Sequence, residues 1–338
     1  MSPLRTSIAL SALIMTSSLM LGACSSSHAA QPTPTTSGAT TTPGSTSDAL
    51  AHSLDITTIP ADLTPPLSDF TSPSTAWPAT ARSIVSRCDA YSNPKLQSAP
   101  TPCLLGDPTG TKTIVLAGDS NAAGWAPALD QGLRSSGYRL AVFPFSGCPV
   151  ADMTYTGLIN SQSSSKCNTW HSSVTSAILG LHPDAVILAS VASIPGVDLT
   201  TPQWSAGIKK FFDAVSTGAN PPARILFGTY PQMVANIPEC LSAHANPQDC
   251  SVTGRYWQLF QANTLERDRR NAQVASAHLI PAVQWLCAPK GCSPVIGTTL
   301  VYVDADHLTM AYSLSIATPV TRAVLDMINP GQSSTTSP

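Results

Sequence analysis

Residues 112–125 constrain the fold of this chain more than any other part of its sequence. Residues 113–117 form a continuous apolar run rich in β-branched side chains, which is typical of a strand buried on both faces. The run ends at Gly118-Asp119-Ser120, and apolar residues four positions apart then predict a helix. Ser120 therefore lies where a buried strand turns into a helix. Open α/β sheets bind ligands at that edge, and the first N–H groups of a helix can stabilise an oxyanion.

A second segment, near the far end of the chain, suggests a chemical role for Ser120. Gly-Asp-Ser alone fits a loop followed by an N-cap serine equally well. A serine hydroxyl becomes a nucleophile beside a base whose tautomer is fixed by a third group. On a turn, Asp304 can reach back to the imidazole of His307, whereas the adjacent Asp306 points to the opposite side in an extended segment. We therefore predict Ser120, His307 and Asp304 as catalytic residues.

These two segments together resemble the SGNH (GDSL-like) hydrolase family. The resemblance is closest to the SGNH domains that are appended to membrane O-acyltransferases, and it covers residues 88–328. The matching blocks are Gly118-Asp119-Ser120-Asn121-Ala122, Trp125-Ala126-Pro127-Ala128-Leu129, Cys148-Pro149 and the Asp304-x-x-His307-Leu308-Thr309 segment. The serine block and the Asp-x-x-His block are fairly specific as a pair, whereas either one alone is weak.

The order of apolar runs and helical patterns predicts an α/β fold. Five expected strands alternate with helices, which implies a parallel sheet covered on both faces. The resemblance implies a three-layer α/β/α sandwich of the SGNH hydrolase (flavodoxin-like) type, with strand order 2-1-3-4-5. The five expected strands are residues 113–117, 138–143, 184–190, 224–228 and 278–283.

Further site residues follow from the resemblance. Gly147, after the second strand, matches the glycine whose N–H helps to form the oxyanion hole, although a turn alone would also explain a glycine there. The family places an asparagine donor after the third strand, and this sequence has none. Ser190 and Ser193 are the candidate substitutes, and the alternative is that the loop does without such a donor. Asn121 replaces a more usual histidine and is expected to line the pocket.

The N-terminal region predicts export. Residues 1–23 read as a signal peptide, and the segment ending at Cys24 resembles the bacterial lipobox, in which that cysteine is lipidated. An ordinary secretory peptide and an uncleaved anchor are the alternatives. Residues 24–80 are rich in Ser, Thr and Pro and are expected to be a tether, unless part of 54–77 packs on the domain. The SGNH-like domain is expected over 81–329, followed by a polar tail over 330–338.

Eight further cysteines agree with export and predict disulfides. Eight cysteines allow 105 connectivities, so the sequence does not settle the pairing. Short closed loops favour sequential pairs, and the resemblance supports the second and fourth of them. A metal cluster is disfavoured, because no Cys-x-x-Cys occurs and no histidine lies at ligand spacing. The pairs are Cys88 with Cys103, Cys148 with Cys167, Cys240 with Cys250, and Cys287 with Cys292.

Composition narrows the choice of function. The net charge is −2 and charged residues make up 11% of the chain, with no basic stripe, which argues against nucleic-acid binding. We expect a lipid-anchored serine esterase or O-acyltransferase on the outer face of a bacterial cell membrane, without a cofactor. Its expected substrates are ester-linked acyl groups, such as O-acetyl groups, of envelope polysaccharide or glycolipid. The alternative is a catalytically weak module that binds glycan or an integral-membrane acyltransferase.

Overall fold

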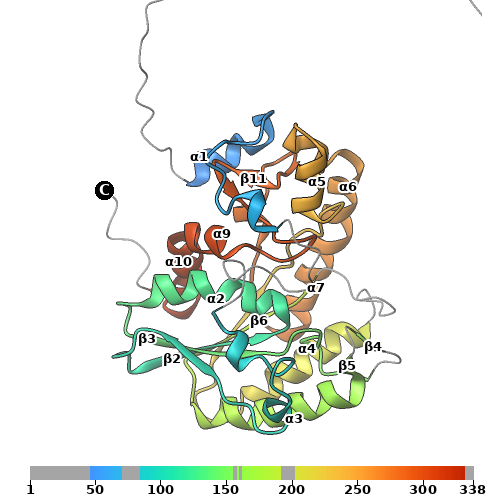
Figure 1. The fold of residues 1–338 in the computed structure, drawn as a ribbon. Helices are drawn as coiled ribbons and strands as arrows, with labels where there is room; N and C mark the ends of the chain where they lie inside the picture. Colours follow the sequence, from blue (N-terminus) through green and yellow to red (C-terminus); the bar gives the residue numbers. More distant parts are fainter. Residues whose placement is uncertain (1–45, 71–83, 155–157, 160–161, 192–201, 332–338) are drawn as a thin grey trace, which may run out of the picture. The chain divides into compact units, whose positions relative to one another are not determined.

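A computed structural model describes residues 46–70, 84–154, 158–159, 162–191 and 202–331 (Figure 1). The predicted signal peptide, Cys24 and most of the polar tail lie outside these residues. Within them, a six-stranded sheet has the order β1-β3-β2-β6-β7-β9. Its strands are β1 (Cys103–Gly106), β2 (Lys112–Gly118), β3 (Tyr138–Pro144), β6 (Ala185–Ala189), β7 (Ala223–Phe227) and β9 (His278–Ile280).

The middle of the sheet determines where a site can form. Strand β2 pairs in parallel with β3 on one side and with β6 on the other. Gly118, the last residue of β2, lies in register with the last residues of both neighbours, Pro144 and Ala189. From β2 the chain passes first to β3 on one side of the sheet and then to β6 on the other side. The carboxyl end of β2 is therefore a topological switch point. Ser120 follows directly at this edge.

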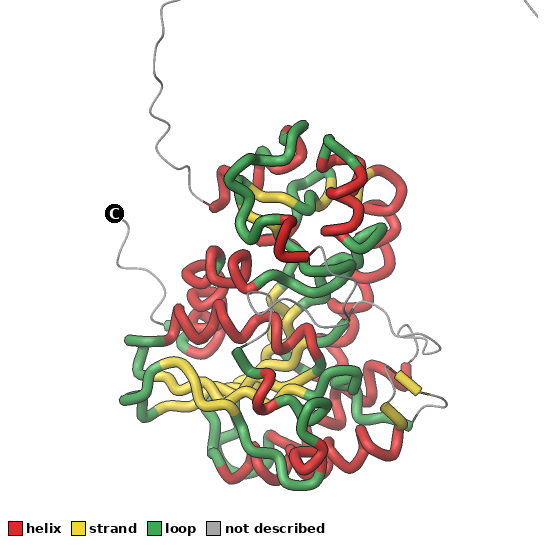
Figure 2. Tube along the Cα trace, viewed as in Figure 1, coloured by secondary structure: helices red, strands yellow, loops and turns green. Residues whose placement is uncertain are grey.

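Helices cover both faces of the sheet (Figures 1 and 2). Ile114 and Leu116 of β2 point into the core formed with α2, α9 and α10, while Val115 and Ala117 point into the core formed with α3, α4 and α7. This alternation is the period-two pattern of a strand that is buried on both faces. The helices are α2 (Ser120–Leu133), α3 (Ser164–Gly180), α4 (Pro202–Val215), α7 (Glu266–Ala275), α9 (Met310–Ser315) and α10 (Ala317–Ile328).

The predicted three-layer α/β/α fold is confirmed, with one difference in the sheet. The five expected strands are parallel and lie in the expected order. A sixth strand, β1, which is not among the five expected strands, pairs antiparallel with β3 at the sheet edge. Strand β1 has four residues, of which Leu104 is largely exposed, so it carries no apolar run that periodicity could detect.

Residues 46–70 correct the expected extent of the tether. They contain α1 (Thr46–Ala51) and two 3₁₀ turns, η1 (Ser53–Asp55) and η2 (Leu67–Phe70), and Leu63 is buried in the core. The Gln248 side chain donates hydrogen bonds to the carbonyl groups of Ser53 and Ile56. The backbone of Thr64 bonds to that of Thr298 and Leu300. Described residues N-terminal to the expected boundary at residue 81 therefore pack on the domain, as in the alternative that part of 54–77 packs on it.

The remaining described elements are short. The other helices are α5 (Ile237–Ala243), α6 (Gly254–Phe260), the π-helical segment η7 (Gln261–Leu265) and α8 (Val283–Leu286). The other 3₁₀ turns are η4 (Ser86–Cys88), η5 (Pro94–Gln97) and η6 (Pro247–Cys250). Three small antiparallel pairs are β4 (Leu158–Ile159) with β5 (Gln162–Ser163), β8 (Val252–Thr253) with β10 (Gly291–Cys292), and β11 (Val295–Ile296) with β12 (Thr299–Leu300).

Four disulfides clamp the loops around this framework. They join the four pairs that sequential pairing predicts, and those assignments are confirmed: Cys88–Cys103, Cys148–Cys167, Cys240–Cys250 and Cys287–Cys292. Closed loops of this kind restrict the unfolded chain and stabilise the folded one. Among the helices of the described residues, none combines the length and apolar character that a membrane crossing requires.

Candidate active site

Three side chains that lie far apart in the sequence meet at the carboxyl end of β2. Ser120 is the first residue of α2, and its Oγ lies 2.7 Å from Nε2 of His307. Nδ1 of the same imidazole lies 2.8 Å from Oδ2 of Asp304. The imidazole therefore bridges the hydroxyl and the carboxylate through its two nitrogens. This arrangement gives a serine a base with a fixed tautomer.

The segment that carries the base is a turn rather than an extended strand. Oδ1 of Asp304 accepts hydrogen bonds from the backbone N–H groups of Asp306 and His307, both at 2.9 Å. The N–H of Val303 donates to the carbonyl of His307 and closes the turn. Oδ1 of this carboxylate thus shapes the turn, and both of its oxygens lie within hydrogen-bond distance of Nδ1 of His307, at 3.0 and 2.8 Å.

The turn corrects the expected position of Asp306. Its Oδ1 lies 3.1 Å from Nδ1 of His307, on the same side of the imidazole as Asp304. The expectation that Asp306 points away assumed an extended segment, and it is wrong because Asp304 folds the segment into a turn.

The electrostatics of the three groups follow from these contacts. Burial disfavours the imidazolium, but the hydrogen bonds and charges of Asp304 and Asp306 outweigh burial and raise the pKa of His307 to about 10. Burial raises the pKa of Asp304, yet the hydrogen bond and the charge of His307 lower it below its usual value. The site therefore favours a carboxylate beside an imidazolium, which is the charge state that forms when a serine is deprotonated.

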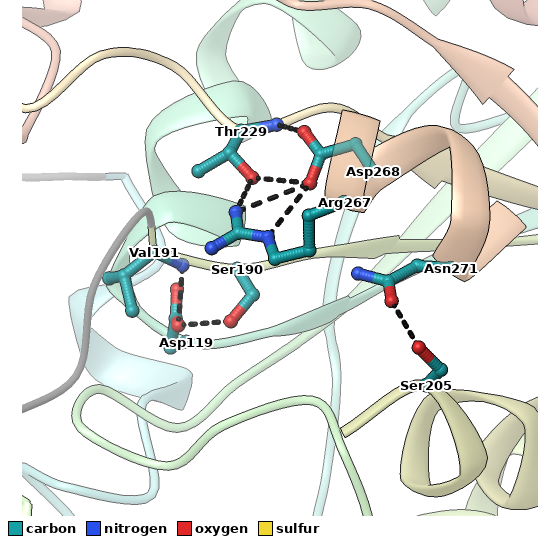
Figure 3. A network of polar contacts seen from close by, with 8 residues as sticks. All are labelled: Asp119, Ser190, Val191, Ser205, Thr229, Arg267, Asp268 and Asn271. Atoms are coloured by element: carbon teal, nitrogen blue, oxygen red, sulfur yellow. Dashed lines mark hydrogen bonds and ion pairs between the residues drawn. The ribbon is translucent and has the colours of Figure 1, made fainter. Parts of the chain in front are cut away.

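Asp119 holds the turn next to the serine, a role that the sequence analysis missed. Its buried carboxylate accepts hydrogen bonds from the N–H of Asn121 at 2.9 Å and the N–H of Val191 at 3.0 Å. The hydroxyl of Ser190 donates to the same carboxylate at 2.9 Å (Figure 3). Burial raises the pKa of Asp119 to about 6. Its N-cap position before a helix was the available signal.

This network corrects the role expected of Ser190. Its hydroxyl proton is directed to Asp119, so it is not available as a donor to an oxyanion. Ser193, the other candidate, lies outside the described residues. Asn121 is 2% exposed and its amide oxygen has no hydrogen-bond partner in the described part of the chain, so its side chain packs in the core beside the nucleophile.

Gly147 lies in a tight turn that is fixed by hydrogen bonds to a side chain outside the turn. The N–H of Cys148 donates to the carbonyl of Phe145, and Gly147 has φ +81°, so this position favours glycine. Asp89 accepts hydrogen bonds from the N–H and the hydroxyl of Ser146. In the described part of the chain, the N–H of Gly147 is not used by the turn. It is therefore available as a donor, together with the N–H of Ser120 at the helix start.

Hydrogen bonds join helix α2, which begins at Ser120, to helix α9, which follows His307. Pro127 lies inside α2, and the N–H of the next residue, Ala128, donates to the hydroxyl of Ser313 on α9. That hydroxyl donates in turn to the carbonyl of Gly124. The Ser313 hydroxyl is thus inserted between the two groups that would pair in an unbroken helix. Because α9 follows His307 closely, this insertion fixes one segment against the other.

A buried polar cluster lies beside the loop that follows β6 (Figure 3). Arg267 donates to the hydroxyl of Thr229 and pairs with Asp268, and Asp268 also accepts the N–H of Thr229. A small cavity between Arg267 and Ser190 is large enough for about one water molecule. The paired charges and the small volume indicate a structural role in holding Thr229, which lies just after β7.

One group of described residues has the donors for a cation. Asp304, Asp306 and His307 place one donor atom each within 4.8 Å of one another. A cation there would take the Nδ1 lone pair and displace the proton that the Asp304 carboxylate accepts. Cation binding and the serine–histidine–aspartate arrangement are therefore competing uses of the same atoms.

Comparisons with known proteins place the chain in a family. The family model described as "SGNH domain (fused to AT3 domains)" matches residues 87–322. A search of curated proteins found no match.

Solved structures with a similar fold have low sequence identity. The periplasmic domain of a lipopolysaccharide acetyltransferase from Salmonella ser. Paratyphi A has 16% identity and a TM-score of 0.48, covering 64% of this chain and 85% of that one. Est24, a carbohydrate acetylesterase from Sinorhizobium meliloti, has 10% identity and a TM-score of 0.37, covering 64% and 100%. An aryl esterase from M. smegmatis has 15% identity and a TM-score of 0.39, covering 64% and 100%.

Proposed function

This chain belongs to the family of SGNH domains fused to AT3 domains, and we propose that it is a serine esterase or O-acyltransferase that works through Ser120. The observation that carries the proposal is the pair of contacts made by one imidazole, 2.7 Å to the Ser120 hydroxyl and 2.8 Å to the Asp304 carboxylate. Substrates of this reaction class are esters, and the substrates that we propose are ester-linked acyl groups on envelope carbohydrates, such as O-acetyl groups.

The proposed mechanism is a two-step acyl transfer. His307 accepts the proton of Ser120 as Oγ attacks the ester carbonyl, and Asp304 holds the imidazolium that forms. The N–H groups of Ser120 and Gly147 donate to the oxyanion. His307 then returns the proton to the leaving alcohol, which departs and leaves an acyl group on Ser120. Water or a sugar hydroxyl attacks this acyl-enzyme with His307 as the base, and the serine is regenerated.

A second candidate function is a catalytically weak module that binds glycan or a membrane acyltransferase. The observation that favours it is the loop after β6, which offers no asparagine and directs the Ser190 hydroxyl to Asp119. Loss of one oxyanion donor in a serine protease lowers kcat by about 10²- to 10³-fold. A weak enzyme and a binding module are therefore the two outcomes that an acyl-transfer assay must separate.

Mixing the purified domain with 4-nitrophenyl acetate tests the proposal. We expect a burst of about one equivalent of nitrophenol per domain if deacylation is slower than acylation, and an acetyl group on the Ser120 peptide in an acid-quenched sample. A sugar acceptor should shorten the lifetime of this adduct if the domain transfers acyl groups. Absence of both turnover and adduct, in a domain shown to be folded by circular dichroism, would favour the binding module.

We also propose that the protein is exported and held on the outer face of the membrane by lipidated Cys24. The support is the lipobox-like segment and four disulfides, which form in oxidising compartments. Several acyl chains on one cysteine anchor firmly, whereas a single chain is marginal. A membrane acyltransferase is the proposed partner, because family members are fused to AT3 domains.

Replacing Cys24 by alanine should release the protein from membranes without changing its fold. The expected result is a shift of the protein from the membrane pellet to the soluble fraction, together with loss of metabolic labelling by a fatty-acid analogue. Ser25→Ala is the matched control and should leave both unchanged. A Cys24→Ala protein that stays in the pellet without a label would contradict the lipid anchor.

A further inference from the structure

The side chain of Asp306 lies at the base of the proposed triad but takes no part in the usual three-residue arrangement. Its Oδ1 is 3.1 Å from Nδ1 of His307, which is an ion-pair distance. The hydrogen bond from Nδ1 goes to Asp304, at 2.8 Å to one oxygen and 3.0 Å to the other. The imidazole thus faces two carboxylates on the side opposite Ser120, and Asp304 is the nearer of the two to Nδ1.

We propose that Asp306 is a positioning residue whose charge stabilises the His307 imidazolium and sets the pH range in which His307 can act as a base. This inference rests on the proposed function of Ser120 and His307. It assigns separate tasks to the two aspartates. Asp304 fixes the tautomer and shapes the turn, while Asp306 adds its negative charge beside Nδ1 from a slightly longer distance.

The local geometry explains why the two carboxylates lie together. Oδ1 of Asp304 binds the backbone N–H of Asp306, which holds the next carboxylate on the same side of the turn. The side chains of His307, Asp304 and Asp306 are 18%, 23% and 27% exposed, so solvent screens their interaction in part. The positive charge of the imidazolium offsets the repulsion between the two carboxylates.

The other groups near His307 come from two neighbouring segments and from its own turn. Asp119, at the start of α2, interacts electrostatically with His307. Tyr230, in the loop after β7, lies near Asp119, Asp304 and Asp306, and its pKa is raised by burial and by these charges. The Ser120 hydroxyl contacts Nε2. Asp304 and Asp306 are the two carboxylates within hydrogen-bond or ion-pair distance of the ring among the described residues.

A raised pKa has two opposite effects on the rate. A larger fraction of His307 is protonated at neutral pH and cannot accept the serine proton. The neutral fraction that remains is a stronger base, and the imidazolium formed in the transition state is more stable. The value of kcat/KM for an acyl ester should therefore rise with pH through the neutral range and continue to rise toward pH 10.

Removing the Asp306 charge should make the pH profile cross that of the wild type. Charges at this distance shift a pKa by about one to three units, so Asp306→Asn should lower the pKa of His307 by at least about one unit. The variant should be faster than wild type at the acidic end and slower on the alkaline plateau. A purely structural defect would lower kcat/KM at every pH without moving the profile.

The lowered pKa of His307 in Asp306→Asn should also alter how the free energy of unfolding depends on pH. The folded-state pKa of His307 lies above its unfolded value of 6.5, so the stability that it contributes is fully present below about pH 6.5. That contribution is lost as pH rises through about 10. In Asp306→Asn the loss should be complete at a lower pH, and it can be followed by urea unfolding without any substrate.

The deciding experiment is an NMR titration of ¹⁵N-histidine-labelled protein, with the His307 signals assigned by their loss in His307→Gln. We expect the His307 pKa to fall in Asp306→Asn, to recover in Asp306→Glu, and to stay unchanged in Asp62→Asn, which removes the same charge from an exposed side chain. A fall of the His307 pKa in Asp306→Asn by less than about one unit would overturn the proposal, because an opposite charge at this distance shifts a pKa by about one to three units. Because the titration needs no turnover, failure of the proposed activity would not obscure this result.

Discussion

Replacing Ser120 by alanine is expected to lower kcat for a short acyl ester by about 10⁶-fold, as removal of the nucleophile does in a serine protease. The variant keeps the N–H groups of the oxyanion site but has no hydroxyl for His307 to deprotonate. Residual hydrolysis would then come from binding and oxyanion stabilisation alone. The measurement is steady-state hydrolysis of 4-nitrophenyl acetate, with mass spectrometry to confirm that the acetyl adduct is absent.

Folding should survive this change. Ser120→Ala removes one hydrogen bond, which contributes about 1 kcal/mol, and leaves the Asp119 cap of α2 intact. Ser172→Ala is the matched control, because that exposed hydroxyl on α3 bonds to a backbone carbonyl of its own helix. It should retain wild-type activity. If Ser120→Ala kept more than about a tenth of the wild-type rate, the acyl-enzyme mechanism would be excluded.

The fold could be predicted where burial leaves a signal in the local sequence. The run at 113–117 is apolar on both faces because helices cover both sides of β2, and the structure extends the predicted strand by one residue at each end. The break between α9 and α10 at Ile316 lies three residues before Pro319, which fits in the first turn of α10. Each of these features depends on residues that are close in sequence.

The missed features depend on contacts between distant segments. Residues 46–70 have the composition of a tether, and they pack because Gln248 and the backbone near Thr298 satisfy their polar groups. Strand β1 exists because β3 offers an unpaired edge close to the Cys88–Cys103 disulfide. Neither interaction leaves a period in the local sequence, so packing of part of 54–77 stayed one of two alternatives and β1 was not expected.

In the candidate active site, too, some features follow from the local sequence and others depend on the folded structure. The Asp-x-x-His spacing was enough to bring Asp304 to Nδ1 of His307. The position of Asp306 depended on whether the segment is extended or turned, and that is decided by the Asp304 side chain itself. The use of the Ser190 hydroxyl depended on the register of β2 with β6, which places Asp119 opposite the end of β6. The residue types were enough to predict acyl-transfer chemistry. The turn and the strand register determined which of their atoms contact one another.

Replacing Asp304 by asparagine is expected to lower kcat by about 10⁴-fold, because the same change in a serine protease left the imidazole in the wrong tautomer. An amide that keeps its oxygen on the two backbone N–H groups presents its NH₂ to Nδ1. His307 must then carry its proton on Nε2, where it can no longer accept the proton of Ser120.

The loss should be similar at every pH, since no change of pH restores the correct tautomer of the neutral ring. Asp306→Asn is the matched comparison, because it removes the same charge 3.1 Å from the same nitrogen but leaves the hydrogen bond to Asp304 in place. Its effect should therefore be a displaced pH profile with a much smaller change in maximal rate. Circular dichroism should show both variants folded. An inactive Asp306→Asn beside an active Asp304→Asn would reverse the two assignments, because the tautomer would then be fixed by Asp306.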